Sequence, residues 1–339
     1  MKKFAALLLA VCLLVSLASC AEVKEPLTQT ETKTTENAPD NTTIRLMAMT
    51  GPTGMGLAEL LHNDKAGSGN ACDYEAELVS EPSQVAPNLI KGECDIAAVP
   101  INLAAVLFNN PNVDVQILCA NTLGVLYMVE NGQSIQSIAD LKGKTIYAPN
   151  PGSTPEYVLR YVLKENGIDP DQDVTLEFLT GGDEVAAKLA TTENAIGMLP
   201  EPKVSSFLSQ NTAFHIALDM TKEWNQVAGE GNTLVQGVFV ARKAFIDEHP
   251  TLVNAFLEDY KKSQNTVNSD PEKGAEYIVE AGIIPKAPLA KKAIPGSNIT
   301  FLEGNAMKSA VSKCLNVLYE ANAASVGGKM PTDDIYYAR

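Results

Sequence analysis

Four short segments of this sequence combine glycine or proline with hydroxyl, amide or carboxylate side chains. They are residues 50–56 (Thr-Gly-Pro-Thr-Gly-Met-Gly), 100–102 (Pro-Ile-Asn), 150–156 (Asn-Pro-Gly-Ser-Thr-Pro-Glu) and 200–202 (Pro-Glu-Pro). Each follows a predicted β-strand, and open α/β sheets bind ligands beyond the carboxyl ends of their strands. Glycine lets the backbone approach a ligand closely, and a helix start presents free N–H groups. These segments predict reversible binding of a small polar molecule.

Each segment also has a simpler interpretation. Residues 50–56 could form a plain strand-to-helix turn. Ser153 and Glu156 have the spacing of a capping box, and Pro155 suits a first helical turn. The Glu201 carboxylate could stabilise a helix start or pair with a ligand amine. The sequence leaves these alternatives open.

Motifs for catalysis and for metal binding are absent from the sequence. The histidines His62, His215 and His249 are far apart, and none lies in a serine, cysteine or metal motif. The chain contains no Walker loop, no G-x-G-x-x-G, no G-x-S-x-G, no H-E-x-x-H and no C-x-x-C. We therefore predict a binding protein that is not an enzyme and that uses no metal or cofactor. An enzyme built from Glu201 and the loop hydroxyls is one alternative, and a sensory protein using the same cleft is another.

The beginning of the chain predicts secretion and lipid anchoring. A Lys-Lys start is followed by an apolar run to Val15 and by Leu-Ala-Ser-Cys at 17–20. This pattern is typical of a secretory signal, and the apolar run is shorter than the ~20 residues that span a bilayer. Leu-Ala-Ser-Cys resembles the bacterial lipobox. We expect residues 1–19 to be removed, Cys20 to carry the lipid, and residues 20–42 to form a polar tether.

The charge of the chain limits its partners. It has 26 basic and 41 acidic residues, a net charge of −15, and no cluster of lysine and arginine. Such a balance argues against nucleic acid and against peripheral binding to anionic lipid. No second long apolar stretch follows Val15. We expect an extracytoplasmic protein that touches the cell membrane only through the lipid on Cys20.

From Thr43 onward, short apolar runs alternate with amphipathic patterns. We predict strands at 44–49, 74–79, 95–99, 145–148, 174–179, 195–199 and 235–242. We predict helices at 54–62, 85–91, 154–165, 183–190, 250–268, 271–281 and 304–323. Alternation of this kind indicates a parallel sheet covered on both faces. The strand, Gly/Pro loop and helix recur near residues 50 and 150, which favours two lobes: 43–125 with 233–339, and 126–232.

Several blocks, in this order, resemble the substrate-binding proteins of nitrate-, sulfonate- and taurine-type ABC importers, a group that includes the thiamine-precursor-binding proteins. The blocks are Lys-Gly-Glu-Cys-Asp-Ile-Ala at 91–97, Ser-Ile-Ala-Asp-Leu-Lys-Gly-Lys-Thr-Ile-Tyr-Ala at 137–148, Gly-Ser-Thr at 152–154, Leu-Lys-Glu-Asn-Gly-Ile-Asp-Pro at 163–170, and Val-Phe-Val-Ala-Arg at 238–242 with His-Pro at 249–250. The block between Asp140 and Pro170 is the most specific. The similarity covers nearly the whole chain from residue 43.

This resemblance implies a type II periplasmic-binding-protein fold, with two α/β lobes joined by a two-strand hinge and a ligand in a central cleft. It also implies delivery of the solute to an ABC permease and its ATPase by a monomer. By position, the ligand-binding residues would be Thr53, Gly54, Met55, Pro100, Asn102, Asn121, Thr122, Asn150, Gly152, Ser153, Thr154, Pro200 and Glu201. Trp224, the only tryptophan, would be either a ring-stacking wall of the cleft or a core residue.

The sequence departs from what an oxyanion site would require. The four arginines are at 45, 160, 242 and 339, outside the predicted loops, and those loops contain no lysine. A sulfonate-like oxyanion held by helix starts and hydroxyls remains one option, and a neutral or zwitterionic metabolite is the other. The cysteine-rich motif of thiamine-precursor binding is absent. If the strand order follows the family, Cys72 and Cys94 precede strands on opposite sides of the first strand, about 9.5 Å apart, and stay free thiols.

Overall fold

The computed structural model describes residues 40–339, so the signal segment, Cys20 and most of the predicted tether lie outside it. The strands are β1 Ile44–Met49, β2 Tyr74–Val79, β3 Ile96–Pro100, β4 Val115–Leu123, β5 Leu126–Glu130, β6 Thr145–Pro149, β7 Thr175–Leu179, β8 Ile196–Pro200, β9 His215–Asp219, β10 Val235–Arg242 and β11 Ile299–Leu302. The helices are α1 Pro52–Met55, α2 Ala58–Lys65, α3 Val85–Lys91, α4 Ile101–Phe108, α5 Thr154–Glu165, α6 Gly182–Thr191, α7 Lys203–Gln210, α8 Met220–Ala228, α9 Lys243–Glu248, α10 Pro250–Ser269, α11 Pro271–Glu280, α12 Ala287–Ala293 and α13 Gly304–Ala321, with five short 3₁₀ turns (η1–η5).

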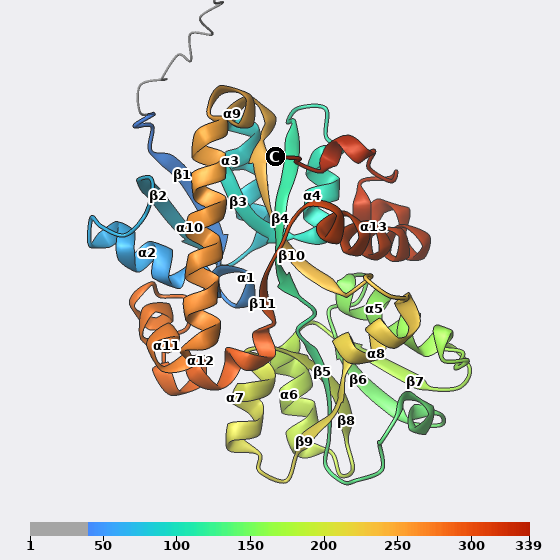
Figure 1. Cartoon of the computed structure of the whole chain (residues 1–339). Helices are drawn as coiled ribbons and strands as arrows, with labels where there is room; N and C mark the ends of the chain where they lie inside the picture. The colour runs from blue at the N-terminus through green and yellow to red at the C-terminus, as the bar shows by residue number, and fades with distance from the viewer. Residues whose placement is uncertain (1–39) are drawn as a thin grey trace, which may run out of the picture. The chain divides into compact units, whose positions relative to one another are not determined.

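These strands form two sheets (Figure 1). The first has the order β11-β4-β10-β3-β1-β2, and the second has the order β7-β6-β8-β5-β9. We call each sheet with its covering helices a lobe, lobe 1 and lobe 2. The chain passes from lobe 1 to lobe 2 between β4 and β5, and it returns between α8 and β10. The two crossings therefore lie at residues 123–126 and 228–235.

Both sheets are mixed rather than purely parallel. β1 pairs in parallel with β2 and β3, whereas β10 is antiparallel to both β3 and β4. In lobe 2, β6 is parallel to β7 and β8, and β5 is antiparallel to β8 and β9. The antiparallel members are β5 and β10, which adjoin the crossings, and β11, which pairs antiparallel with β4. The expectation of a parallel sheet holds for the βαβ units and fails at these three strands.

Each sheet buries apolar side chains on two faces. In lobe 1, one face packs on α3, α4 and α13 and the other on α2, α9 and α10. In lobe 2, one face packs on α6 and α7 and the other on α5 and α8. Buried side chains of α5, α8 and α13 belong to one apolar cluster, so this cluster extends from one lobe into the other. Within residues 40–339, no helix is both long and apolar enough to cross a membrane.

The predicted helix at 54–62 is in fact two helices, α1 and α2, separated at Gly56 and Leu57. The Gly56 carbonyl accepts a hydrogen bond from Ser263 Oγ at 2.7 Å, and Ser263 Oγ in turn accepts one from Leu60 N–H at 3.0 Å. A side chain at Gly56 would meet the Tyr260 hydroxyl at 2.6 Å. The helix breaks there because α10 supplies hydrogen-bond partners from a distant part of the chain.

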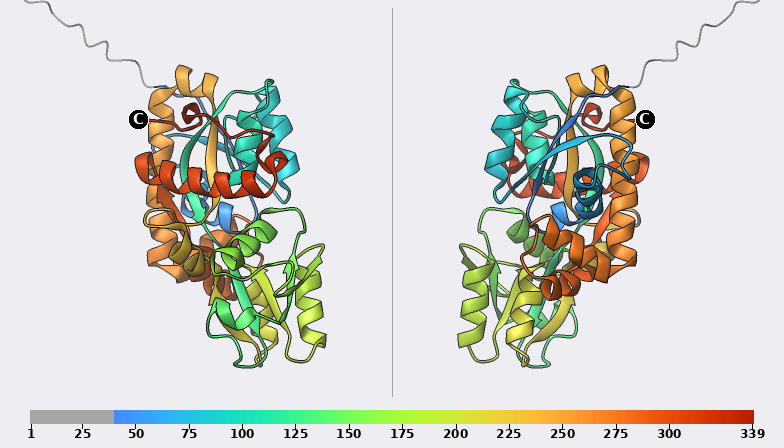
Figure 2. Two further views of the ribbon diagram at one scale, coloured as in Figure 1. Left: turned by 90° about the vertical axis from the view of Figure 1, so that its right-hand side faces the viewer. Right: turned by 90° about the vertical axis from the view of Figure 1, so that its left-hand side faces the viewer.

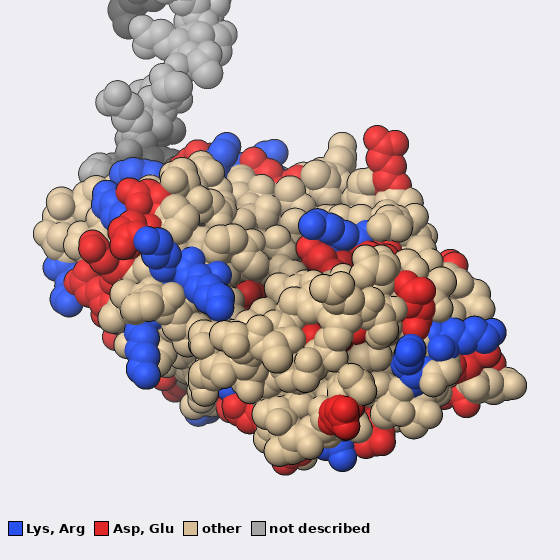
Figure 3. Space-filling view, turned by 90° about the horizontal axis from the view of Figure 1, so that it is seen from below, with Lys and Arg blue, Asp and Glu red and all other residues tan. Residues whose placement is uncertain are grey.

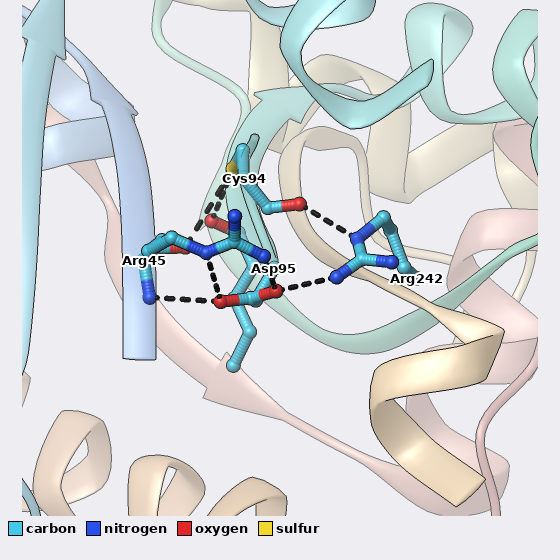
Figure 4. A network of polar contacts seen from close by, with 5 residues as sticks. Arg45, Cys94, Asp95 and Arg242 are labelled. Atoms are coloured by element: carbon cyan, nitrogen blue, oxygen red, sulfur yellow. Dashed lines mark hydrogen bonds and ion pairs between the residues drawn. The ribbon is translucent and has the colours of Figure 1, made fainter. Parts of the chain in front are cut away.

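An ion-pair network joins β1, β3 and β10 at the end of the sheet away from the predicted loops (Figure 4). The buried Asp95 carboxylate accepts hydrogen bonds from Arg45 N, Nε and Nη2, at 3.0, 2.9 and 2.5 Å. It also accepts one from Arg242 Nη2 at 2.6 Å. Burial alone would raise the pKa of Asp95, but the hydrogen bonds from the two arginines hold it below its usual value.

Candidate functional site

The predicted residues of lobe 1 meet around Gly237, in the middle of β10. Asn121 Nδ2 donates to the Thr53 carbonyl at 3.2 Å, and Thr122 Oγ1 donates to Asn121 Oδ1 at 3.1 Å. Asn121 and Thr122 are fully buried. A Cβ at Gly237 would lie 2.5 Å from Thr53 Cγ2 and 2.6 Å from Asn121 Oδ1. The absence of a side chain at position 237 is what allows the start of α1 to approach β4.

Pro100 reaches the same place from β3, because it pairs with Gly237 in the antiparallel β3–β10 register. Asn102 follows in the first turn of α4 and is partly exposed. Gly54 is buried beneath the Met49 carbonyl, which leaves no room for a side chain. The side chain of Met55 packs in an apolar cluster with residues of α11 and α12, including Ala275 and Ala290. Thr53, Pro100, Asn121 and Thr122 are thus brought together, while Met55 is directed into the core.

The predicted residues of lobe 2 form the turn between β6 and α5. Asn150 and Gly152 both have positive φ, 57° and 73°. Ser153 Oγ donates to the Asn150 carbonyl at 2.5 Å, and the Glu156 carboxylate accepts from Gly152 N–H at 2.7 Å. The side chain of Ser153 makes no capping hydrogen bond to α5, so the predicted capping box is wrong. The two positive-φ residues turn the backbone so that Glu156 meets the N–H of Gly152 instead of that of Ser153.

Thr154 is buried at the first turn of α5, and other strand ends of lobe 2 lie near this turn. Asn150 Oδ1 would be 3.7 Å from a Cβ at Gly181, and Pro200 Cδ would be 3.5 Å from one at Gly182. These two glycines open α6, and Lys203, which opens α7, pairs with Asp183. Strand ends β6, β7 and β8 therefore converge on one edge of the second sheet. No hydrogen bond or ion pair within residues 40–339 joins the turn at 50–56 to the turn at 150–156.

Glu201 follows β8 and has an unusual environment. Its side chain is buried, and Oε1 accepts a hydrogen bond from Ser205 Oγ at 2.8 Å. Its Oε2 is also buried and has no hydrogen-bond partner among the residues that the structure describes. Burial raises the pKa of Glu201 to about 7, although Ser205 and the charge of Lys292 act in the opposite direction.

The junction of the two lobes surrounds Glu201. Its backbone N–H donates to the carbonyl of Val125, at the first crossing. A Cβ at Gly296, in η3 Pro295–Ser297, would lie 2.6 Å from Glu201 Oε1. Tyr127 Oη donates to the Gly296 carbonyl at 2.7 Å, and Asn298 Nδ2 donates to the Gly124 carbonyl at 2.6 Å. Hydrogen bonds from Tyr127 and from Asn298 thus hold segment 295–298 against the first crossing.

A second junction lies between α5 and α13, whose proximity Figure 2 shows. Asn322 Nδ2, after α13, donates to Tyr157 Oη at 3.1 Å, and Tyr157 Oη donates to the Gly152 carbonyl at 2.9 Å. A cavity of about 410 Å³ lies beside this junction and is lined by Glu156, Tyr157, Arg160, Tyr161, Lys164, Pro170, Asp171, Val317, Glu320 and Ala321. Trp224 is buried nearby, its ring 4.6 Å from that of Tyr161 and its Nε1 donating to the Asn232 carbonyl at 2.8 Å. Trp224 therefore packs at the α5–α8 contact.

All four arginines are engaged in ion pairs. Arg45 and Arg242 share Asp95, Arg160 pairs with Glu156 and Asp171, and Arg339 pairs with Glu258 and Glu303. On the face shown in Figure 3, basic and acidic side chains lie beside one another in mixed groups, separated by uncharged surface. No guanidinium is left unpaired to meet an anion at the predicted loops.

Sequence reasoning missed several residues of this region. Gly237, Gly296, Tyr127 and Asn298 make the contacts described above but lie outside the four loops. A glycine in the middle of an otherwise apolar strand, as in Val-Gln-Gly-Val-Phe-Val at 235–240, is a known sign of close approach and could have pointed to Gly237. The other three carry no signal of this kind because their partners are distant in sequence.

The two-lobed architecture is shared with solved structures of transport proteins. An ABC transporter from Parabacteroides distasonis, known from a crystal structure, is 23% identical over 88% of this chain and 100% of that chain, with a TM-score of 0.73. The periplasmic aliphatic sulphonate binding protein SsuA from Escherichia coli is 17% identical over 84% of this chain and 89% of its own, with a TM-score of 0.66. The periplasmic nitrate-binding protein NrtA from Synechocystis PCC 6803 is 14% identical over 86% and 85%, with a TM-score of 0.58.

The chain has the fold of the type II periplasmic binding proteins, with two α/β lobes joined by two crossings. A sequence profile described as NMT1/THI5 like matches residues 73–274. The chain belongs to this NMT1/THI5-like family. No curated protein is significantly similar to it in sequence.

Proposed function

We propose that this protein is an extracytoplasmic, lipid-anchored solute-binding protein that captures a small molecule between its lobes and delivers it to an ABC permease. The observation that carries the proposal is the convergence of Thr53, Pro100, Asn121 and Thr122 around Gly237, in a lobe that is joined by two crossings to a second lobe with its own converging strand ends. The fold shared with the sulphonate- and nitrate-binding proteins named above supports it. The proposal includes lobe boundaries at 43–125 with 233–339 and at 126–232.

In this proposal the ligand contacts backbone and polar side chains from both lobes, and the lobes close on it. Lobe 1 would contribute Thr53, Pro100, Asn102 and the Asn121–Thr122 pair. Lobe 2 would contribute the turn at 150–154 and Pro200 with Glu201. Because the chain passes between the lobes at only two crossings, closure is a hinge motion of the kind that binding proteins undergo. The protein acts as a monomer and catalyses no reaction.

Thermal stabilisation tests solute binding. A ligand that binds only the folded state raises the free energy of unfolding by about 2.7 kcal/mol at a hundredfold excess over Kd. A screen of sulfonates, nitrate, amino acids and vitamins should therefore raise the melting temperature with at least one compound. The hit should also reduce the radius of gyration in solution scattering and be recovered chemically unchanged. Turnover of the bound compound would support the enzyme alternative instead.

Membrane attachment is tested separately. We propose that Cys20 carries the lipid and that the cell membrane is contacted only through it. The full-length chain should partition into the membrane fraction and should label with a radioactive fatty acid, whereas Cys20→Ala should lose the label. Cys12→Ala, within the apolar run, is the matched control and should keep it. Equal labelling of Cys20→Ala and the natural chain would contradict the lipid anchor.

A further inference from the structure

Glu201 is a buried hydrogen-bond acceptor that lacks a donor. Its Oε1 is satisfied by Ser205, but Oε2 has no partner within residues 40–339. Leaving a buried polar atom unpaired costs about 1–3 kcal/mol, and more when the atom is charged. Native structures therefore pair such atoms with protein, water or ligand. A carboxylate at this position needs a donor that the described chain does not provide.

The groups around Glu201 cannot supply this donor. The Ser205 hydroxyl already donates to Oε1, and the Tyr127 hydroxyl donates to the Gly296 carbonyl. Lys292 contributes an attractive charge, but within residues 40–339 it makes no hydrogen bond or ion pair with Glu201. Gly296 packs directly against the carboxylate, because a Cβ there would lie 2.6 Å from Glu201 Oε1. What remains is an acidic group at the junction of the lobes, next to the predicted ligand residue Pro200.

The charged side chains of the protein favour a positively charged ligand. All four arginines are held by carboxylates of the protein itself, so an anionic ligand would find no free guanidinium and would be repelled by Glu201 once this residue ionises. Burial raises the pKa of Glu201, so a positive partner would favour its ionised form at neutral pH. A basic nitrogen brings both the charge and the N–H donor that Oε2 lacks.

We infer that the solute carries a basic nitrogen, an amine or amidine that is protonated when bound, and that Glu201 recognises it through Oε2. This inference rests on the proposed function and names its substrate class. Such a solute is opposite in charge to the ligands after which the sulphonate- and nitrate-binding proteins are named. A zwitterion fits if its cationic end faces Glu201. Glu201 then determines specificity by rejecting compounds that lack the nitrogen.

The test uses a low-molecular-weight filtrate of yeast extract, divided on a strong cation exchanger at pH 3. The exchanger retains every compound with a basic nitrogen, zwitterions included, and lets simple anions and neutral compounds flow through. Each fraction is added in a dilution series to the purified protein, and the melting temperature is recorded. The same series is run on Glu201→Gln. Circular dichroism and the melting temperature without additive show that the variant is folded.

Glu59→Gln is the matched control. Glu59 lies in α2, is similarly buried, and also has an Oε2 without a partner in residues 40–339, but it is not at the junction of the lobes. We expect the retained fraction to stabilise the natural protein and Glu59→Gln equally. Glu201→Gln should need about tenfold to hundredfold more of the fraction for the same shift, as the loss of a charged hydrogen bond implies.

The remaining outcomes separate this inference from the proposed function. Stabilisation by the flow-through alone, or equal stabilisation of Glu201→Gln and Glu59→Gln by the retained fraction, would overturn the basic-nitrogen inference and leave solute binding intact. Stabilisation by neither fraction would overturn solute binding itself.

Discussion

Replacing Asp95 by asparagine should destabilise lobe 1 without altering the ligand loops. The substitution keeps the shape of the side chain but removes the charge that two arginines share (Figure 4). The new amide nitrogen would also face guanidinium donors, so at least one hydrogen bond becomes a donor–donor contact. The side chains of Arg45 and Arg242 are 39% and 21% exposed, which lets water compensate in part.

The expected magnitude follows from this geometry. Breaking a fully buried ion pair by removing one partner costs about 3–5 kcal/mol. Because both arginines reach water, we expect about 2–3 kcal/mol for Asp95→Asn. A folded unit of about 300 residues has an unfolding entropy of roughly 0.6 kcal/mol/K, so the melting temperature should fall by about 3–5 °C. Asp171→Asn is the control: it removes an exposed partner of Arg160 and should cost less than about 1 kcal/mol.

The pH dependence makes this prediction stricter. The pKa of Asp95 is lowered in the folded protein, so its stabilisation is present above the pKa of the unfolded chain, about 3.9, and is lost as the pH falls through the folded value. Thermal melting followed by circular dichroism should show the full difference between Asp95→Asn and the natural protein at pH 7 and a smaller one near pH 3. Equal melting temperatures at pH 7, or a difference that persists unchanged at pH 3, would refute the reasoning.

Three further predictions concern the site. Gly237→Ala places a methyl group 2.5 Å from Thr53 Cγ2. Differential scanning calorimetry should therefore show that the free energy of unfolding falls by about 1–3 kcal/mol, and ligand affinity should fall as well. An unchanged thermogram would contradict the close approach. Tyr157→Phe removes the hydroxyl that joins Asn322 to the Gly152 carbonyl, so amide hydrogen exchange after β6 should speed up by about tenfold, and unaltered exchange would show that the contact is unimportant. Burial raises the pKa of Glu201 from 4.5 to about 7, so its contribution to stability is present below pH 4.5 and is lost as the pH rises through 7. In urea titrations at different pH values, Glu201→Gln should remove on the order of 3 kcal/mol of this pH dependence. Parallel curves of unfolding free energy against pH for the two proteins would argue against the buried carboxyl.

Much of the fold could be predicted from local sequence patterns. β1, β2 and α5 have the predicted bounds, and glycines with positive φ, Gly92 and Gly167, follow the ends of α3 and α5. β1 lies between β2 and β3, so Cys72 and Cys94 precede strands on opposite sides of it, as the family order implied. Free thiols remain a prediction, which a thiol count on unreduced, unfolded protein will test. These features depend on periodicity and on glycine, both of which act over a few residues.

The candidate site was less accessible to the same reasoning. The strand-end loops were found because their composition is distinctive, but Ser153 proved to bond the Asn150 carbonyl instead of capping α5. Hydrogen-bond partners of that kind depend on the backbone conformation of a few residues, which composition does not specify. β4 and β5, which flank the first crossing, were not predicted as strands because both are almost wholly buried, so apolar and polar residues do not alternate along them.

By itself, the sequence determined the α/β class and the lack of an arginine in the loops, since these follow from residue types and their local order. Only the tertiary structure decided that Gly237 admits Thr53 and Asn121, that Gly296 lies against Glu201, and that one oxygen of this carboxylate has no donor within residues 40–339. The physical reason is that such contacts join residues dozens to more than a hundred positions apart. Their geometry is set by strand register and helix packing, which no short stretch of sequence contains.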